Sequence, residues 1–296
     1  MKKTAKKKAI ILILTILIAI SLGVLGTLVF KNKDSNKTVD NENEEVIKVI
    51  DPYEAEKTKY AENKAINSDY VGDIYFTSGL INQSFVQATS VYKDNGELYT
   101  FYNKNGTLVS DPTGYTGNDV YIWTYWKTGE YDYNDNGGSV FMDYRNHLTD
   151  QNLIIYGHHF SEWNDETRSK SFTPLEQLLE EENYKDNKEV NLLLEDEIRT
   201  YELWAVYKHD FTDGEYIMKA QYWRCNYNYD DYTDTTDENF YQNYIDFINE
   251  HKLYDTDVEL TTNDKTLTLQ TCITGRAGDL YEICVFKQTG VTKFDD

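Results

Sequence analysis

The sequence predicts a mainly β fold: a closed or nearly closed barrel of about eight strands, with an N-terminal helix, peripheral helices and an N-terminal transmembrane anchor. Short runs rich in Val, Ile, Tyr and Trp alternate with turns rich in Gly, Asn and Asp, as half-buried strands require. The chain is 40% hydrophobic and has only three prolines, so it can form a packed core and is not mostly disordered. The predicted strands begin at Val71, Gly96, Asp119, Ser139, Leu153, Glu189, Arg199, Lys265 and Leu280.

The N-terminus carries an uncharged segment, Ala9–Phe30, that is long enough as a helix to cross the ~30 Å hydrocarbon core of a bilayer. Lysines precede this segment, which favours a cytoplasmic N-terminus and an extracellular remainder. A cleaved signal peptide is the alternative, but its apolar core is usually about 7–15 residues long and ends in an A-x-A-like site. No such site follows here. We therefore expect residues 1–31 to be a single-pass signal anchor in the cell membrane.

The remainder of the chain divides into a tether and one domain. Residues 32–45 are polar without apolar periodicity, which is typical of a flexible linker. Residues 46–296 form the predicted extracellular domain, with a helix over 46–67 and the barrel over 68–296. No internal repeat or second domain is evident.

Two further helices are predicted from their start signals. Thr173 and Glu176 flank a proline at the first helical position, and Thr235 and Glu238 have the spacing of a capping box. Apolar residues with helical spacing follow the second signal. Both helices are expected to lie outside the barrel.

The charge excludes one class of partner. The chain has a formal net charge of −22, although lysines and no acidic residue precede residue 32. The predicted extracellular part is therefore strongly acidic and would repel a nucleic-acid backbone. Cationic or amine-bearing partners would be attracted to it at low salt.

The chain contains three cysteines, Cys225, Cys272 and Cys284. Cysteines outside the cell tend to pair, but an odd number leaves at least one thiol that is unpaired or bonded to another molecule. Such a thiol is a candidate nucleophile, although all three residues could instead be small buried hydrophobes. A disulfide between Cys272 and Cys284 is a further alternative, and it would block the chemistry of Cys272.

Two strand ends carry the residues with the clearest chemistry. Leu153–Phe160 (LIIYGHHF) is an apolar strand that ends in glycine and His158, and Thr268–Cys272 (TLQTC) is an alternating strand that ends in the cysteine. A Cys–His pair on neighbouring strands is what acyl transfer to a thiol needs. The imidazole either withdraws the thiol proton or forms an ion pair with the thiolate, and later protonates the leaving amine. The alternative is a structural histidine and a core cysteine.

These two motifs together resemble the sortases. The segment Gly138–Phe160, the Thr-Pro-Leu helix after it and Glu202–Asp210 are similar to class B sortases in particular. The resemblance implies an eight-stranded barrel in a membrane-tethered cysteine transpeptidase, a thiol protease-type hydrolase, of Gram-positive bacteria. Such an enzyme cleaves the C-terminal sorting signal of a surface protein through a thioester. It then transfers the protein to an amine of a cell-wall peptidoglycan precursor or a pilin, with no metal or organic cofactor.

The resemblance also implies the roles of individual residues. Cys272 matches the nucleophile and His158 the family histidine, while His159 should point the other way in an extended backbone. Thr268, Gln270 and Thr271 are the predicted substrate-binding positions on the cysteine strand.

One position departs from the family pattern. The family places an arginine at the start of the final strand, where it helps to hold the substrate and the oxyanion, but this chain has Tyr281 there. Arg276, in the loop after Cys272, is the predicted replacement because its side chain is long. If Arg276 does not serve, the chain is a catalytically impaired sortase-like protein that binds sorting signals or cell-wall peptides. A cysteine peptidase, in which water resolves the thioester, is the other alternative.

Overall fold

The structure is a computed structural model. It describes residues 51–160, 170–210, 240–273 and 280–294. The predicted membrane anchor and tether, Cys225, Arg276 and the capping signal at Thr235 lie outside the described residues. Within the described ranges, no helix is both long and apolar enough to span a membrane.

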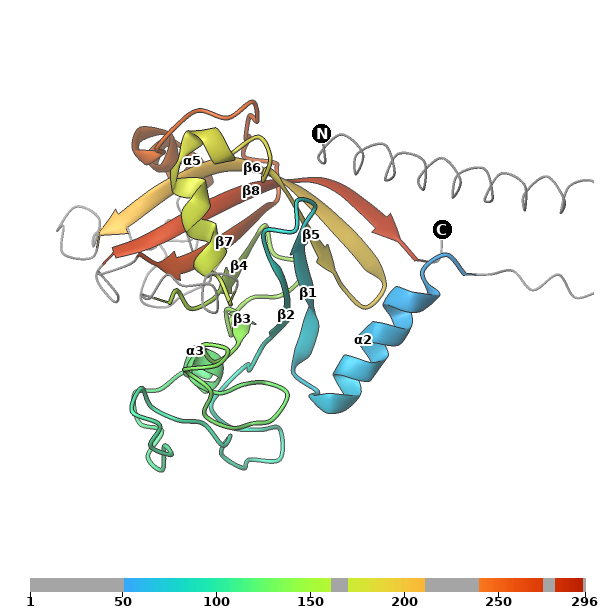
Figure 1. Cartoon of the computed structure of the whole chain (residues 1–296), viewed down its shortest axis with the longest axis vertical. Helices are drawn as coiled ribbons and strands as arrows, with labels where there is room; N and C mark the ends of the chain where they lie inside the picture. Colours follow the sequence, from blue (N-terminus) through green and yellow to red (C-terminus); the bar gives the residue numbers. More distant parts are fainter. Residues whose placement is uncertain (1–50, 161–169, 211–239, 274–279, 295–296) are drawn as a thin grey trace, which may run out of the picture. The chain divides into compact units, whose positions relative to one another are not determined.

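Eight strands form a closed β-barrel (Figure 1). They are β1 (Tyr70–Phe76), β2 (Asn82–Val86), β3 (Val140–Met142), β4 (Asn152–Tyr156), β5 (Glu189–Leu193), β6 (Glu197–Asp210), β7 (Thr266–Cys272) and β8 (Leu280–Lys293). Their order around the barrel is β1-β2-β3-β4-β7-β8-β6-β5, and β1 also pairs with β5 to close it. The predicted mainly β fold and eight-stranded barrel are confirmed.

The pairing of β4 with β7 positions the site. These two strands are parallel, with Tyr156 opposite Gln270, although they lie far apart in the sequence. Because parallel strands run in one direction, both end at the same edge of the barrel. His158, which follows the end of β4, and Cys272, the last residue of β7, are therefore brought to the same edge.

The barrel interior is filled by every second residue of each strand. Leu153 and Ile155 of β4, Leu267 and Leu269 of β7 and Phe286 of β8 belong to one buried cluster. Burial of each such side chain contributes about 1.5–3 kcal/mol. The alternation turns Gln270 and Cys272 away from this interior, onto the outer face of β7.

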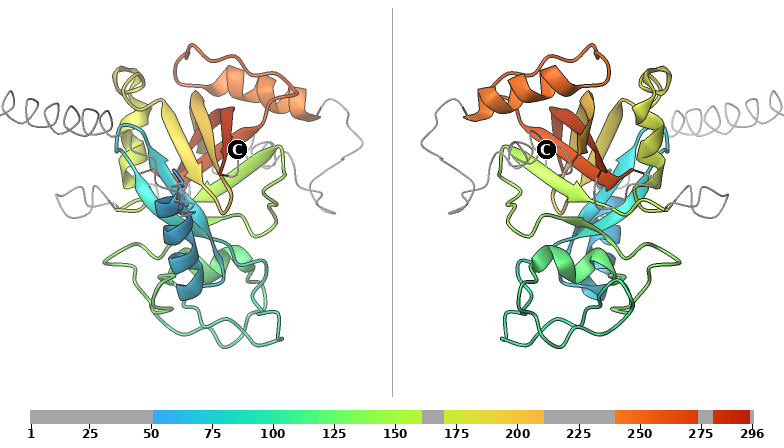
Figure 2. Two further views of the ribbon diagram at one scale, coloured as in Figure 1. Left: turned by 90° about the vertical axis from the view of Figure 1, so that its right-hand side faces the viewer. Right: turned by 90° about the vertical axis from the view of Figure 1, so that its left-hand side faces the viewer.

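The described residues include five short helices beside the barrel. They are α2 (Glu54–Ile66), α3 (Gly117–Ile122), η1 (Thr173–Leu179), η2 (Glu181–Asn183) and α5 (Phe240–His251), of which η1 and η2 are 3-10 helices. Helix α5 lies outside the barrel beside β6 (Figure 2). Its residues Tyr244, Phe247 and Ile248 belong to one buried cluster with Trp204 and Ile283.

Two predicted strands are wrong. The run beginning at Gly96 contributes only two isolated bridges, between Tyr92 and Leu98 and between Tyr102 and Leu108. The run beginning at Asp119 starts inside α3, which ends at Ile122, because Thr116 and Asp119 form a reciprocal capping box that begins a helix there. The polar strand β2 was not predicted from the sequence.

The predicted helices are found with altered bounds. The N-terminal helix begins at Glu54, and α5 is described from Phe240. The Thr-Pro-Leu segment is the 3-10 helix η1, whose N-cap is Phe172 rather than Thr173. The Thr173 hydroxyl instead accepts a hydrogen bond of 3.0 Å from the backbone N–H of Phe160.

Candidate active site

A cavity of about 210 Å³ lies at the shared edge of β4 and β7. His158, Gln270, Thr271, Cys272 and Tyr281 are among its lining residues. Larger cavities of about 990 and 660 Å³ are present elsewhere, but no predicted site residue lines either of them. The cavity at the strand edge is therefore the candidate active site.

Gly157 holds the loop that presents His158. Its N–H donates a hydrogen bond of 3.1 Å to the carbonyl of Gln270, and its own carbonyl accepts one of 2.8 Å from Thr271 Oγ1. A Cβ atom at this position would lie 2.5 Å from Cγ of Phe172, closer than real contacts allow. Glycine is thus required for the close packing that fixes the histidine loop against β7.

Aromatic rings enclose the imidazole of His158. The ring centroids of Trp123 and Tyr133 lie 4.7 and 5.6 Å from it. Its Nε2 is buried and has no hydrogen-bond partner among the described residues. Burial lowers the pKa of His158 to about 4, and a hydrogen bond with the backbone of Ile122 opposes this shift only in part. At neutral pH the imidazole is therefore uncharged and able to accept a proton.

His159 takes a different, structural role. Its Nε2 lies 3.1 Å from Oε2 of Glu176 in η1, and its side chain is almost completely buried. This contact and the bond from Phe160 to Thr173 attach the loop to η1 on the side away from the cavity. The two adjacent histidines thus point to opposite sides, as an extended backbone requires.

Cys272 is the last residue of β7 and is half-buried. Both Cys272 and Cys284 are thiols, so the structure does not contain the disulfide considered from the sequence. The reason is geometric, because Cys284 pairs with Leu269 and faces the barrel interior, whereas Cys272 faces the outer surface. The Cys272 thiol therefore remains available for chemistry.

The predicted substrate-binding residues are only partly brought together. Gln270 and Thr271 line the cavity, and the buried Oε1 of Gln270 has no hydrogen-bond partner among the described residues. Thr268 does not line it; this residue is fully buried, and its hydroxyl donates to Oδ1 of Asn152 at 2.9 Å. The position of Arg276 lies outside the described residues.

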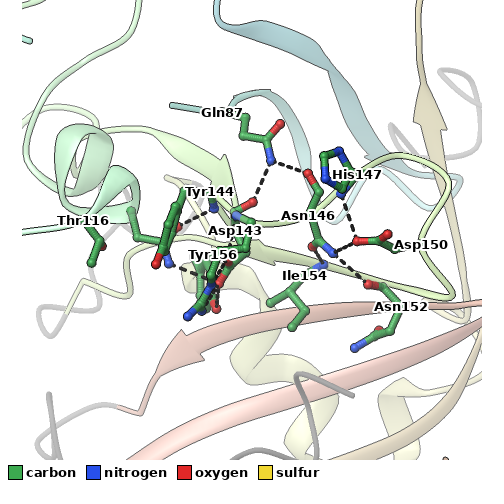
Figure 3. A network of polar contacts seen from close by, with 12 residues as sticks. Gln87, Thr116, Asp143, Tyr144, Asn146, His147, Asp150, Asn152, Ile154 and Tyr156 are labelled. Atoms are coloured by element: carbon green, nitrogen blue, oxygen red, sulfur yellow. Dashed lines mark hydrogen bonds and ion pairs between the residues drawn. The ribbon is translucent and has the colours of Figure 1, made fainter. Parts of the chain in front are cut away.

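A polar network supports the cavity wall opposite β7 (Figure 3). The fully buried carboxylate of Asp143 accepts hydrogen bonds from the Tyr156 hydroxyl at 2.7 Å and from the Asn118 amide at 3.1 Å. Arg145 pairs with the same carboxylate through Nε and Nη2, each at 2.8 Å. Tyr156 and Asn118 both line the cavity, so Asp143 fixes two of its wall residues.

The same network anchors the loop between β3 and β4 (Figure 3). The amide of Asn146 accepts from the backbone N–H of Ile154 at 2.8 Å and donates to the carbonyl of Asn152 at 3.0 Å. Gln87 donates to the carbonyls of Asp143 and Asn146. These contacts fix the start of β4, and β4 in turn carries the histidine.

Sequence reasoning does not assign Trp123, Tyr133 or Asp143 to the active site. Trp123 falls in a predicted strand whose first residues are in fact α3. Tyr133 and Asp143 fall in a stretch that mimics half of a calcium loop, for which an Asn/Gly turn is the favoured interpretation. The Asp-x-Arg spacing of Asp143 and Arg145 could have indicated a buried ion pair, because an aspartate buried between apolar residues needs a cationic partner. The sequence did not reveal that this pair supports the cavity.

Comparisons with known proteins agree with this geometry. Over 190 residues the chain is 27% identical to the Sortase B of Staphylococcus aureus (strain NCTC 8325 / PS 47), covering 63% of this chain and 67% of that protein. The structure of a Staphylococcus aureus sortase B–substrate complex has a TM-score of 0.54 and 22% identity, covering 80% of this chain and 86% of that one. The structure of Clostridium perfringens sortase B also has a TM-score of 0.54 and 22% identity, covering 78% of this chain and 99% of that one. No protein-family model matches the chain.

The closed barrel with a thiol and an imidazole at one strand edge is thus a sortase-type fold. Within that class, the resemblance to the class B sortases that the sequence motifs indicate is confirmed. The solved structures establish the barrel, and the similarity to Sortase B supports the general class of cysteine transpeptidase.

Proposed function

We propose that this protein is a membrane-anchored, class B-like sortase that cleaves a C-terminal sorting signal and transfers the surface protein to an amine. The observation that carries the proposal is that Cys272 and His158 line one cavity at the ends of two neighbouring parallel strands. The acceptor is an amine of a cell-wall peptidoglycan precursor or a pilin of a Gram-positive cell. The N-terminus is cytoplasmic, a single helix crosses the membrane, and the barrel is extracellular.

The bond-forming, bond-breaking and proton-transfer steps on the protein use Cys272 and His158. Neutral His158 accepts the thiol proton while the sulfur of Cys272 attacks the scissile carbonyl carbon, and the carbonyl π pair moves to the oxygen. When the tetrahedral intermediate collapses, the C–N bond breaks and the leaving nitrogen takes the proton from His158. The acceptor amine then attacks the thioester, and its proton returns through His158 to the departing sulfur. No metal or cofactor enters these steps.

The acyl group is held by residues around this pair. Gln270 offers a buried carbonyl oxygen that can accept a hydrogen bond from the sorting signal, and Thr271 completes the same wall. Arg276 is the proposed cationic clamp on the substrate and the oxyanion. Thr268 does not contact the sorting signal; its hydrogen bond to Asn152 of β4 helps to hold β7 in place.

Intact-mass analysis tests this function directly. The full-length chain, purified in detergent, is incubated with a library of sorting-signal peptides, with Cys272→Ala as the control. We expect an acyl mass increase on Cys272, which amines representing peptidoglycan cross-bridges or a lysine side chain convert to a ligated product. Absence of any adduct across the library, with the protein folded, would contradict the proposal.

A second candidate is a catalytically silent sortase-like protein that binds sorting signals. One observation favours it: Tyr281 stands where the resemblance implies an arginine. Peptide binding measured by calorimetry, without an adduct on Cys272, would support the binding protein. An adduct that water resolves, with no ligation to any amine, would instead indicate a cysteine peptidase.

A further inference from the structure

A separate cavity of about 320 Å³ is lined by residues of α2, β1 and β2, by the segment 125–140 and by Ser171. We call it the polar cavity. Its volume is within the ~300–1,000 Å³ range of small-molecule sites. None of the predicted site residues lines it, and Val140 is the only aliphatic side chain among its described lining residues. Amide and hydroxyl side chains border most of the remaining surface.

The floor of the polar cavity contains a buried charge that is already compensated. Asp73 of β1 is 2% exposed, and its Oδ1 accepts a hydrogen bond of 2.6 Å from Ser84, its partner across the β1–β2 pair. Lys59 Nζ of α2, which lies beside β1 (Figure 1), is 2.7 Å from the other carboxylate oxygen. A cationic ligand would have to displace Lys59, and an anionic ligand would be repelled by Asp73. The floor therefore favours a neutral ligand.

Ser171 contributes a hydroxyl without a partner. The residue is 4% exposed and lines the polar cavity, but its Oγ has no hydrogen-bond partner among the described residues. Its φ is +47°, a left-handed conformation that costs a serine free energy and that glycine adopts readily. A buried hydroxyl without a partner is unfavourable as well. A ligand that forms a hydrogen bond with Ser171 would remove this second cost.

The polar residues of β2 also belong to this cavity. Asn82 and Ser84 lie on the outer face of β2, opposite Tyr75 and Asp73, whereas Ile74 of β1 belongs to the barrel interior. Asn82 is exposed at the rim, and Ser84 holds the carboxylate of the floor. The amides at the rim both donate and accept hydrogen bonds. The polar sequence of β2 is therefore explained by the cavity that it lines.

We propose that the polar cavity binds a neutral sugar ring. Sugar hydroxyls donate and accept hydrogen bonds at close spacing, which suits a cavity with amide, hydroxyl and carboxylate groups. Asp73 accepts from one sugar hydroxyl, Ser171 pairs with a second, and Asn82 binds a substituent at the rim. A peptide fits less well, because its apolar side chains would meet little apolar surface. This inference goes beyond the proposed function, since binding here requires neither Cys272 nor turnover.

Ser171→Gly tests the site, because it removes the hydroxyl and relieves the backbone strain. Calorimetry measures binding of the N-acetylglucosamine trisaccharide to the full-length chain in a sugar-free detergent. We expect saturable binding by the wild type and an affinity about three- to tenfold lower for Ser171→Gly, as the loss of one hydrogen bond implies. The Tm should stay close to that of the wild type, because strain relief offsets the greater freedom of glycine in the unfolded chain. Ser110→Gly, at an exposed position, is the matched control.

Asp73→Asn provides a second, independent variant. It keeps the size of the side chain but removes the charge, and hydrogen bonds to a charged acceptor are stronger than neutral ones. We therefore expect at least tenfold weaker binding of the trisaccharide. Lys59 is 52% exposed, so its ammonium group remains solvated when the ion pair is lost.

Three outcomes would overturn the inference. Absence of trisaccharide binding by the folded wild type would show that the polar cavity contains only solvent. Equal affinities of the wild type, Ser171→Gly and Asp73→Asn would place the sugar elsewhere on the protein. Tighter binding of a blocked, uncharged tripeptide, lost in the same two variants, would assign the cavity to a peptide. Cys272→Ala should bind the trisaccharide as the wild type does, so failure of the proposed transpeptidation would leave this result unaffected.

Discussion

The hydroxyl of Thr271 donates a hydrogen bond of 2.8 Å to the carbonyl oxygen of Gly157. It therefore connects the residue before the proposed nucleophile with the residue before the proposed acid–base group. The parallel register of β4 and β7 brings the two strand ends level, and this side chain joins the histidine loop to the cysteine strand. The relative position of Cys272 and His158 depends on one side-chain hydrogen bond in addition to the backbone ladder.

Thr271→Val should lower the rate of thioester formation about tenfold with little change in KM, because small displacements of reacting groups cost large factors in rate. Valine has nearly the same shape but cannot donate, so the carbonyl of Gly157 loses its partner. The measurement is single-turnover acylation, followed by intact mass. Thr271→Ser retains the hydroxyl and should react at close to the wild-type rate. Equal impairment of both variants would show that the methyl group, not the hydrogen bond, is what matters.

Gly157→Ala should destabilise the protein by about 1–3 kcal/mol and slow acylation, because the added methyl overlaps the ring of Phe172. Urea unfolding at neutral pH measures the loss. Gly290→Ala is the matched control, since a Cβ there meets only Thr200 at an ordinary 3.7 Å. If Gly157→Ala were as stable as this control, Phe172 would have room to move and the glycine would not be required.

Asp143→Asn should be strongly destabilising, by about 3 kcal/mol, because it leaves the guanidinium of Arg145 largely buried without its carboxylate. The change also weakens the acceptor for the Tyr156 hydroxyl and the Asn118 amide, so the cavity wall should loosen. Urea unfolding measures the change in stability. An increase in KM for the sorting-signal peptide would show that the cavity wall has loosened. Asp94→Asn, at an exposed position, provides the control. A variant as stable as the control would mean that the network contributes no net stability.

The sequence was sufficient to predict the barrel and the two strand ends, because the alternating apolar pattern and the motifs around His158 and Cys272 are local signals. Local signals misled where two tendencies compete: the run from Asp119 is β-prone, yet the capping box at Thr116 begins a helix. The strand β2 escaped prediction because its first three residues, Asn82–Ser84, are polar. Of these two segments, only α3 contributes to the active-site cavity, through Asn118 and Ile122.

Long-range register explains what else was not predicted. The sequence shows that Tyr281 stands where the family has its arginine. Only the pairing of β7 with β8 shows that Tyr281 lies opposite Cys272. Likewise, Thr268 shares a face with Gln270 and Cys272, yet it is fully buried, does not line the cavity and donates its hydroxyl to Asn152. The exposure of a strand residue depends on what packs over it, and the strand's own sequence does not contain that information.

Glu282 is a buried carboxyl inside the barrel, opposite Thr271. Cys284 donates to its Oε1 through the thiol at 3.4 Å, and its Oε2 has no hydrogen-bond partner among the described residues. Burial raises the pKa of Glu282 to about 8, with a smaller contribution from the charge of Glu176 and opposition from the Cys284 hydrogen bond. Burial also raises the pKa of the Cys284 thiol, so it remains a donor.

Glu282→Gln should therefore change how stability depends on pH. In the unfolded chain this carboxyl ionises above about pH 4.5, whereas in the folded protein it holds its proton up to about pH 8. Wild-type stability should fall across that window by up to about 1.4 kcal/mol per pH unit from this residue alone. Glutamine has nearly the same size and stays neutral. The free energy of unfolding of the variant, relative to that of the wild type, should therefore increase as pH rises from 5 to 8. Urea midpoints across that range measure the difference.

The control is Glu62→Gln on the exposed surface of α2, which should leave the wild-type pH dependence intact. His158 titrates in the opposite sense, since its lowered pKa makes the protein more stable as pH rises from about 4 to 6.5. Because both Glu282→Gln and the wild type retain His158, its contribution cancels in the comparison. Parallel stability curves for the two proteins would show that Glu282 is ionised in the folded barrel and has a counter-charge or water that lowers its pKa.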